Sequence, residues 1–310
     1  MVLRQALLTG ARSERLRKLV STMPVSSAIV SRFVAGETAD EAVEAARRLL
    51  ADGLQSSIDH LGEDTLDREQ ATRTTNAYLT LLERLSRAGL TRGAEVSVKL
   101  SAIGRALGAD GEKIALDNAR TIALAAQNAG TTLTLDMEEH TTVDSTLSVL
   151  HELRRDFPET GAVLQAYLHR TEADCRDLAH EGSRVRLCKG AYNEPPFVAY
   201  QKPNDVDRAF VRCLKILMAG QGYPMVATHD PRLIEIASAL AMRHDRSRGS
   251  YEFQMLYGIR PQEQLRLVAL GDTVRVYVPY GDQWYAYLMR RLAERPANTG
   301  FFVRSLLTRS

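Results

Sequence analysis

Short runs of β-branched and apolar residues alternate with longer amphipathic stretches along the chain from about residue 54. Eight of these runs fit strands, at 56–62, 95–100, 132–137, 161–168, 184–190, 224–229, 251–256 and 274–281. Helical periodicity fills the segments between them, at 67–88, 111–129, 142–156, 171–181, 204–220, 230–244 and 261–270. Parallel strands joined by helical crossovers produce this pattern, and eight such units over about 250 residues indicate an α/β fold, a (βα)8 barrel. The alternative is a doubly wound open sheet, but no G-x-G-x-x-G follows a strand.

Residues 1–53 precede the repeating pattern and predict a helical arm. A basic helix near 3–19 is followed by the run SSAIVSRFVAG and by a second helix at about 37–52. We therefore expect two parts, an N-terminal helical arm at 1–53 and a catalytic barrel at 54–310.

The stretch AYLMRRLAERPAN, residues 286–298, predicts a last helix that Pro296 stops. Helical spacing puts Tyr287, Arg290 and Arg291 along one stripe, beside an apolar side. Two adjacent guanidinium groups repel each other, so this arrangement predicts an anion that they share.

Composition favours a small-molecule site. The net charge is +2, from 40 basic and 38 acidic side chains, which gives no electrostatic reason to expect a nucleic-acid partner. The three cysteines lack C-x-x-C spacing, so neither a disulfide framework nor a zinc site is predicted, and a reducing cytoplasm fits. No secretory leader and no window of about 18 uncharged apolar residues is found, so no membrane span is expected.

Polar residues collect toward the carboxyl ends of the predicted strands, where the loops of a (βα)8 barrel build its catalytic site. They are Asp59, His60, Lys99, Asp136, Glu138, Glu139, Gln165, Arg186, Lys189, His229, Gln254 and Tyr277. One such residue is usually part of a solvated rim, whereas eight strands that end this way predict a site.

Lys99, in VSVKLSA, follows two buried-type valines, so it either pairs with a carboxylate such as Asp136 or Glu294 or has a lowered pKa for Schiff-base chemistry. The acids of LDMEEH suggest a metal at first. Strand alternation, however, sends Asp136 and Glu138 to one face and Glu139 to the other, which leaves too few ligands, so no metal is predicted.

The strand RVRLCKGAYNEPP combines a cation with a small-residue turn. Lys189, Gly190 and Ala191 let a phosphate-bearing or anionic ring system approach the backbone closely, although a Gly-Ala turn after a strand is common.

In this order and spacing, VSVKLSA, LTLDMEEH, LQAYL, VRLCKGAY, ATHD, YEFQMLYG, VRVYVPYG and YLMRRLAERPAN resemble the flavin-dependent proline dehydrogenases, in their short monofunctional bacterial form. The resemblance covers about residues 32–304, and YLMRRLAE with VRLCKGAY is its most specific part. It implies a distorted (βα)8 barrel whose last helix lies over the barrel mouth. It also implies the oxidation of L-proline to 1-pyrroline-5-carboxylate, the first step of proline catabolism.

The resemblance assigns roles residue by residue. Catalytic groups would be Asp136 and Arg186, with Arg186 near the reactive nitrogen of the flavin. Lys99, Arg290 and Arg291 would bind the substrate carboxylate. The pyrrolidine ring would be packed by Leu187, Tyr192, Leu256, Tyr277 and Tyr287. The flavin would be held by Met137, Gln165, Lys189, Gly190, Ala191, Thr228 and His229.

The resemblance implies FAD as the cofactor, ahead of FMN. Asn193 stands where larger bifunctional members have a tryptophan, so that aromatic partner for the adenine is missing. The implied partners are L-proline, a membrane quinone that accepts the electrons, and a separate NAD-dependent pyrroline-5-carboxylate dehydrogenase. The expected location is the cytoplasm. The basic N-terminal helix and the tail FFVRSLLTRS offer contact with anionic lipid at the inner face of the cell membrane, or are simply solvated.

Two rival functions remain at this point. A lysine-dependent aldolase on the same barrel would use Lys99 as its Schiff-base amine, and a non-enzymatic barrel would serve only as a binding module. A flavin spectrum in the purified protein separates the first from the proline dehydrogenase hypothesis.

Overall fold

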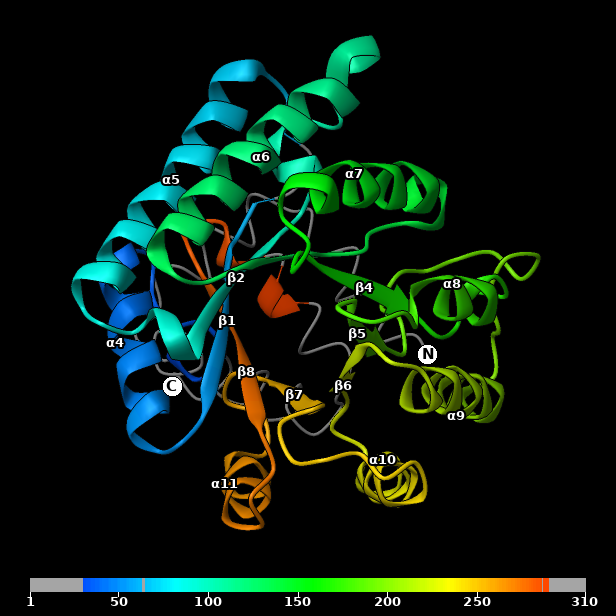
Figure 1. Ribbon diagram of the computed structural model, residues 1–310. Coiled ribbons are helices and arrows are strands. Elements are labelled where there is room, and N and C mark those ends of the chain that lie inside the picture. Colours follow the sequence, from blue (N-terminus) through cyan, green and yellow to red (C-terminus); the bar gives the residue numbers. More distant parts are fainter. Residues whose placement is uncertain (1–29, 63–64, 286, 290–310) are drawn as a thin grey trace, which may run out of the picture.

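The computed structural model describes residues 30–62, 65–285 and 287–289. Within them, eight parallel strands form a closed barrel in sequence order, and β1 pairs with β8 to close it (Figure 1). The strands are β1 (Gln55–His60), β2 (Ala94–Val98), β3 (Leu133–Leu135), β4 (Gly161–Gln165), β5 (Arg184–Cys188), β6 (Tyr223–Ala227), β7 (Glu252–Leu256) and β8 (Val274–Tyr280). All eight predicted strands are confirmed, and the closed barrel excludes the open sheet.

Helices surround the barrel as the periodicity predicts. They are α4 (Ala39–Ala51), α5 (Arg68–Arg87), α6 (Gly111–Ala129), α7 (Val143–Asp156), α8 (Thr171–Leu178), α9 (Pro203–Ala219), α10 (Pro231–Arg243) and α11 (Pro261–Ala269). Local signals set several of their ends. The Asp67 carboxylate accepts from Gln70 N at 2.7 Å to begin α5, and α9, α10 and α11 each begin with proline.

All strands except β7 end one to three residues earlier than predicted, and at β2 and β3 this difference affects the site. β2 stops at Val98 and β3 at Leu135, so Lys99 and Asp136 follow their strands instead of lying in them. The strand alternation assumed for residues 136–139 therefore does not apply. The side chains of Lys99 and Asp136 turn to partners at the barrel mouth, which are described below.

Helix α4 packs against β1, β8 and α5, at the edge of the barrel (Figure 1). A capping box between Thr38 and Glu41 begins it, and one face of small and apolar residues is buried. In a regular (βα)8 barrel the helix that follows β8 occupies this place. The chain boundary predicted at residue 53 stays a prediction.

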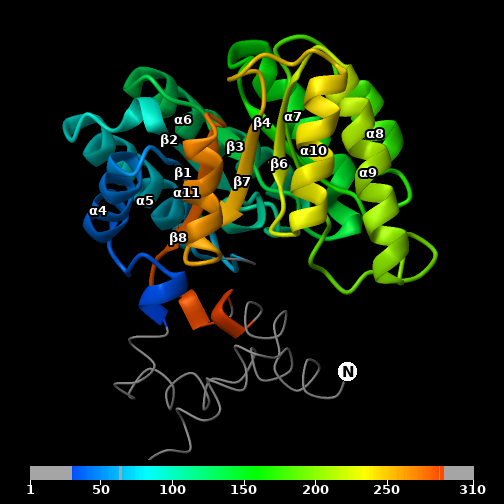
Figure 2. The same ribbon diagram turned by 90° about the horizontal axis from the view of Figure 1, so that it is seen from below.

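The segment after β8 turns toward the carboxyl ends of the strands. A second apolar cluster joins it to the segment before α4 and to the loops after β1 and β7; its members are Phe33, Val34, Leu61, Ile259, Trp284, Tyr285, Tyr287, Leu288 and Met289. Figure 2 shows residues 30–33 together with 284–285 and 287–289 at one end of the barrel. The last helix thus begins over the barrel mouth, as expected, while Arg290 and Arg291 lie outside the described residues.

The barrel interior is unusually polar. Bulky aliphatic side chains commonly fill such interiors. Here the inward positions of β1, β2, β5, β7 and β8 carry Ser57, Asp59, Glu95, Ser97, Arg184, Arg186, Glu252, Gln254, Arg275 and Tyr277, all linked by hydrogen bonds or ion pairs. The main apolar core instead lies between the barrel and its helices.

Among the described residues, no helix is long and apolar enough to cross a membrane.

Candidate active site

Asp136 is the centre of a buried hydrogen-bonding group at the barrel mouth. Its Oδ1 accepts from Ser97 Oγ at 2.7 Å and from Arg186 Nη1 at 2.8 Å, while its Oδ2 accepts from the Tyr277 hydroxyl at 2.6 Å. The Arg186 guanidinium also lies 5.3 Å from the centre of the Tyr277 ring. Segments that are far apart in sequence thereby bring together both predicted catalytic residues, Asp136 and Arg186, with Tyr277, which is predicted to pack against the substrate ring.

Lys99 joins this group from the end of β2. Its ammonium donates to Asp59 Oδ2 at 2.7 Å and to the Tyr277 hydroxyl at 3.3 Å, and lies 3.5 Å from Asp136 Oδ2. The carboxylate partner predicted as one alternative is therefore present. Two carboxylates favour the charged form of the lysine, which disfavours the neutral amine that a Schiff-base aldolase needs.

Asp59 and Asp136, the two carboxyl groups that contact Lys99, have pKa values shifted in opposite directions. Burial raises the pKa of Asp59 to about 6, although Lys99 opposes the rise. Burial acts on Asp136 in the same direction, but Lys99, Arg186 and the hydroxyls of Tyr277 and Ser97 outweigh it and hold its pKa below the ordinary value. Asp136 is therefore the ionised partner over the widest pH range, and titratable pairs of this kind are typical of functional sites.

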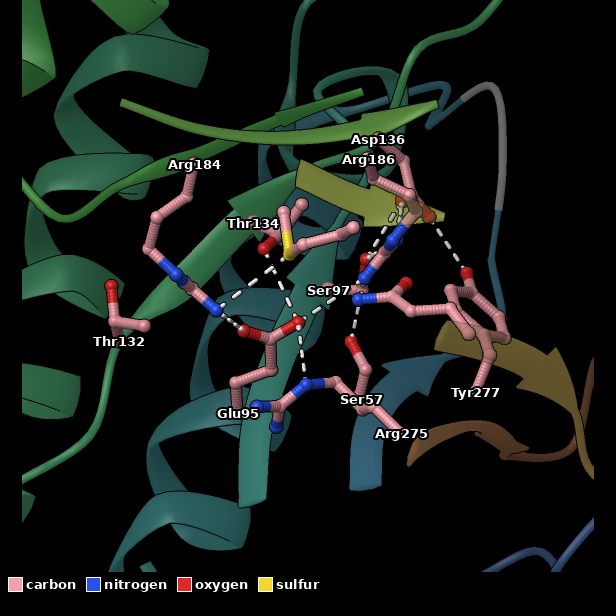
Figure 3. Close-up of polar contacts among 12 residues, drawn as sticks. Ser57, Glu95, Ser97, Thr132, Thr134, Asp136, Arg184, Arg186, Arg275 and Tyr277 are labelled. Atoms are coloured by element: carbon pink, nitrogen blue, oxygen red, sulfur yellow. Dashed lines mark hydrogen bonds and ion pairs between the residues drawn. The ribbon is translucent and has the colours of Figure 1, made fainter. Parts of the chain in front are cut away.

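Charges of alternating sign connect the site with the opposite end of the barrel. Arg186 Nη2 donates to Ser57 Oγ at 2.8 Å and to Glu95 Oε1 at 3.2 Å, and Glu95 is also paired with Arg184 at 2.7 Å. Figure 3 shows Arg186 between Asp136 and Tyr277 on one side and Ser57 and Glu95 on the other. The column runs through Glu252, Arg275, Glu95, Arg186, Asp136, Lys99 and Asp59.

A pocket of about 290 Å³ adjoins the end of β5. Lys189, Gly190, Ala191 and Tyr192 line it, together with residues from the loop after β4 and the start of α9. Gly190 has φ +113°, and a side chain there would run into the Tyr167 ring. The small-residue turn predicted to admit a ligand is thus required by the backbone and by the aromatic ring beneath it.

Lys189 is held by two carboxylates at the rim of this pocket. Its ammonium lies 2.5 Å from Asp207 Oδ1 and 3.5 Å from Asp230 Oδ2, at the starts of α9 and α10. Lys189 is half-buried between these two carboxylates.

The other predicted site residues lie at or near the strand ends. Leu256 packs against the cluster that contains Tyr287, and its backbone N–H donates to His229 Nε2 at 2.9 Å. Gln165 donates to the Glu138 carbonyl at 2.8 Å. Met137 and Thr228, after β3 and β6, are buried.

Leu187 differs from the rest. It is completely buried, and alternation along β5 directs it away from the interior that Arg186 enters. Its predicted contact with a substrate ring stays a prediction.

Sequence reasoning missed several members of the group. Asp59 was noted only as a polar strand end, and Ser57, Glu95, Ser97 and Tyr78 were not singled out. The period of two along β1 and β2 was an available signal, because it places Ser57 with Asp59 and Glu95 with Ser97 on the inward face. Tyr78 gave no such signal, since it comes from α5 and donates to Ser97 O at 2.8 Å.

The acids of LDMEEH separate in the structure. Asp136 joins Arg186, whereas the Glu138 carboxylate accepts from Ser101 and, at 2.6 Å, from Arg105 Nη2. In the part of the chain that the structure describes, no three His, Cys, Asp or Glu side chains are grouped to hold a metal ion.

Comparisons with known proteins agree with this arrangement. Residues 42–304 match the proline dehydrogenase family. The chain is 39% identical to proline dehydrogenase of Deinococcus radiodurans, over 98% of this chain and 97% of the relative. It is 37% identical to proline dehydrogenase 1 of Bacillus subtilis, over 89% of this chain and 90% of the relative.

A solved structure shares the barrel. It is the crystal structure of proline utilization A (PutA) from Bdellovibrio bacteriovorus, which was inactivated by N-propargylglycine. It matches 87% of this chain with a TM-score of 0.80 and 26% sequence identity. This chain spans about a third of that protein, 33% of its length. The full-length relatives and the shared barrel agree: the chain belongs to the proline dehydrogenase family, oxidoreductases that act on the CH–NH group of proline in the first step of proline catabolism.

Proposed function

We propose that the protein oxidises L-proline to 1-pyrroline-5-carboxylate with FAD bound across the barrel mouth, and passes the electrons to a quinone. The observation that carries the proposal is the group in which Asp136 lies within 2.6 to 3.5 Å of Arg186, Lys99 and Tyr277. It combines fixed positive charge, a carboxylate and an aromatic wall in one buried place.

The residues at the mouth fit a flavin. Arg186 Nε is buried and has no hydrogen-bond partner among the described residues, which leaves one donor for a bound group. A guanidinium fixed by Asp136 and Glu95 suits the negative charge that a flavin gains when reduced. The bound FAD supplies the hydride acceptor, and the protein supplies position and charge.

The pocket at the end of β5 suits the phosphate and adenine parts of FAD. It lies beside the first turn of α9, whose backbone N–H groups lack a side-chain cap. Tyr200 lines the same pocket and offers aromatic surface in place of the tryptophan that Asn193 replaces. A pocket of about 290 Å³ beyond the Gly190 turn therefore supports FAD ahead of FMN. In this proposal Met137, Gln165, Thr228 and His229 contact the rest of the cofactor.

Lys99 is the proposed anchor for the substrate carboxylate, together with Arg290 and Arg291, which lie outside the described residues. Tyr277, Tyr287, Tyr192, Leu256 and Leu187 are the proposed surroundings of the pyrrolidine ring. Charge-assisted hydrogen bonds fix the carboxylate, and the buried aromatic rings exclude water, so that the C–H bond next to nitrogen is presented in one orientation.

The electrons leave to a quinone, and the imine product hydrolyses to a reactive semialdehyde. A separate pyrroline-5-carboxylate dehydrogenase is the expected consumer of that product. Contact of the N-terminal arm with anionic lipid would bring the enzyme to its quinone.

Purification without added flavin tests the proposal. We expect a yellow protein from which FAD, not FMN, is released on denaturation. Proline and a short-chain quinone should give one pyrroline-5-carboxylate per quinone reduced, measured by mass spectrometry and absorbance. A colourless protein that FAD does not reconstitute, or turnover without that product, contradicts the proposal.

A further inference from the structure

Asp59 is a buried acid that the proposed chemistry does not use. Its side chain is 1% exposed, lies at the second-last position of β1, and is closer to Lys99 than Asp136 is, at 2.7 Å against 3.5 Å. Tyr78 from α5 fixes it from behind, with its hydroxyl 3.3 Å from Asp59 Oδ1. The same hydroxyl lies 2.8 Å from Ser97 O and 3.2 Å from His60 N, so its position is determined by two strands.

We propose that Asp59 is a positioning residue, which holds the Lys99 ammonium at the mouth and keeps it from moving onto Asp136. This inference rests on the proposed function, in which Lys99 binds the carboxylate of proline.

Competition for one oxygen explains why such a residue is needed. Asp136 Oδ2 already accepts from the Tyr277 hydroxyl at 2.6 Å, and the lysine lies 3.3 Å from that hydroxyl. Without Asp59, the nearest carboxylate oxygen to Lys99 among the described residues is this same Oδ2. The ammonium would move toward it and displace the tyrosine. Both the carboxylate anchor and one wall of the ring site would then shift.

The cost to folding argues against a purely structural role. Burial raises the pKa of Asp59 to about 6, with Asp136 acting in the same direction and Lys99 and the Tyr277 hydroxyl against it. For an acid whose folded-state pKa exceeds the unfolded value of 3.8, stability falls as the pH rises between those two values. Ionisation of Asp59 therefore lowers stability near neutral pH relative to the neutral acid, and the positioning of Lys99 gives the charge a use.

The test compares Asp59→Asn with a matched control, Glu138→Gln. Glu138 is also a buried acid at a strand end, but its carboxylate is bonded to Ser101 and Arg105 and does not touch Lys99. Each variant is measured for thermal unfolding, for KM and kcat with L-proline, and for calorimetric binding of cyclopentanecarboxylate, which has the carboxylate but no amine.

We expect Asp59→Asn to raise KM and the dissociation constant of cyclopentanecarboxylate by about 5- to 50-fold, with kcat changed less and no loss of thermal stability. Tyr78→Phe, which loosens Asp59 without removing its charge, should give a smaller rise of about two- to fivefold. Glu138→Gln should lower the unfolding temperature and leave KM unchanged.

The pH profile adds a readout that a structural role does not produce. The ratio of KM in Asp59→Asn to KM in the unmodified enzyme cancels the ionisation of proline itself. We expect this ratio to be large above about pH 6, where Asp59 is ionised, and to fall toward one below it. The facing groups Lys99, Asp136, Tyr277 and Tyr78 are present in both proteins.

An unchanged KM in folded Asp59→Asn, or failure of that variant to fold, overturns the inference. If the unmodified enzyme neither oxidises proline nor binds cyclopentanecarboxylate, the proposed function fails instead.

Discussion

Tyr277 has two proposed roles, a hydrogen bond from its hydroxyl and a packing surface for the substrate from its ring. Its hydroxyl donates to Asp136 at 2.6 Å, and its ring lies against the Arg186 guanidinium. If the ring packs against proline, Tyr277→Ser exchanges that wall for space and a small hydroxyl. We expect efficiency with L-proline to fall at least about tenfold, while the ratio of hydroxyproline to proline efficiency rises. Steady-state kinetics with both substrates measure this.

Tyr277→Phe is the matched control, because it keeps the wall and removes only the hydroxyl. Its ratio of efficiencies should stay close to that of the unmodified enzyme. Equal ratios in all three proteins would contradict the placement of Tyr277 beside the ring.

Glu95 should affect stability in a pH-dependent way. Burial would raise the pKa of Glu95, but Arg275, Arg184 and Arg186 outweigh it and hold the pKa well below its ordinary value of 4.5. Ionised Glu95 therefore stabilises the fold above that value, and the contribution is lost as the pH falls toward the folded-state pKa. We expect Glu95→Gln to lower the free energy of unfolding by about 3–5 kcal/mol at pH 7.

Urea unfolding at pH 7 and pH 4 measures the effect, which should be smaller at pH 4. Glu181→Gln, at an exposed position, should stay within about 0.5 kcal/mol of the unmodified protein. A pH-independent effect of Glu95→Gln would exclude the ion-pair explanation.

Sequence patterns predicted which types of residue lie at the site, but they did not predict which of these residues contact each other. The position of Lys99 indicated a carboxylate partner, but Asp136 and Glu294 were considered and Asp59 was not. A choice among several acids depends on ångström differences between separate strands, which local periodicity does not contain. The pairing of Arg186 with Glu95 across the barrel could not be predicted for the same reason.

At the scale of elements, the turn after β5 is defined by one glycine. Gly190→Ala places a methyl group against the Tyr167 ring and forces alanine to φ +113°. We expect the purified variant to retain less than about a tenth of the flavin of the unmodified protein, because the turn that admits the ligand must move. Absorbance and released flavin measure occupancy.

Gly182→Ala is the control for this change. Gly182 also has positive φ, +76°, but its added methyl group meets nothing within 4 Å. It should cost about 1 kcal/mol of stability and leave flavin content unchanged. Equal flavin loss in both variants would show that general strain, and not the turn, is responsible.

Strand and helix positions followed from hydrophobic periodicity, because each βα unit buries its own apolar faces. The strand ends did not. β2 and β3 stop at Val98 and Leu135, before residues that the pattern assigned to them. Lys99 and Asp136 are bonded to side chains across the mouth, and such bonds leave no mark on local hydrophobicity.

At the scale of the whole molecule, α4 takes a place in the outer ring of helices. Leu49 is on its buried face, and the helix contacts both strands that close the barrel. We expect Leu49→Ala to cost about 2–5 kcal/mol and the whole protein still to unfold in one transition. Calorimetry and circular dichroism with urea test this.

Leu50→Ala, at the neighbouring position with 41% exposure, should cost much less. A separate early transition in Leu49→Ala would instead mark the arm as an independent unit and support the boundary at residue 53.

The barrel itself followed from the count and spacing of the strands. The helix that turns over the mouth did not, since a helix beside the barrel has the same amphipathic pattern, and only the resemblance to proline dehydrogenases indicated its place. The structure extends that helix over the mouth as far as Met289.

The most direct test of the account is anaerobic titration of the purified flavoprotein with L-proline. We expect L-proline to bleach the oxidised flavin spectrum completely, with one pyrroline-5-carboxylate formed per flavin. The variant Arg186→Met should still bind proline, but its flavin should be bleached much more slowly than that of the unmodified enzyme. A flavin spectrum that L-proline leaves unchanged, in protein that dithionite does reduce, would contradict the account.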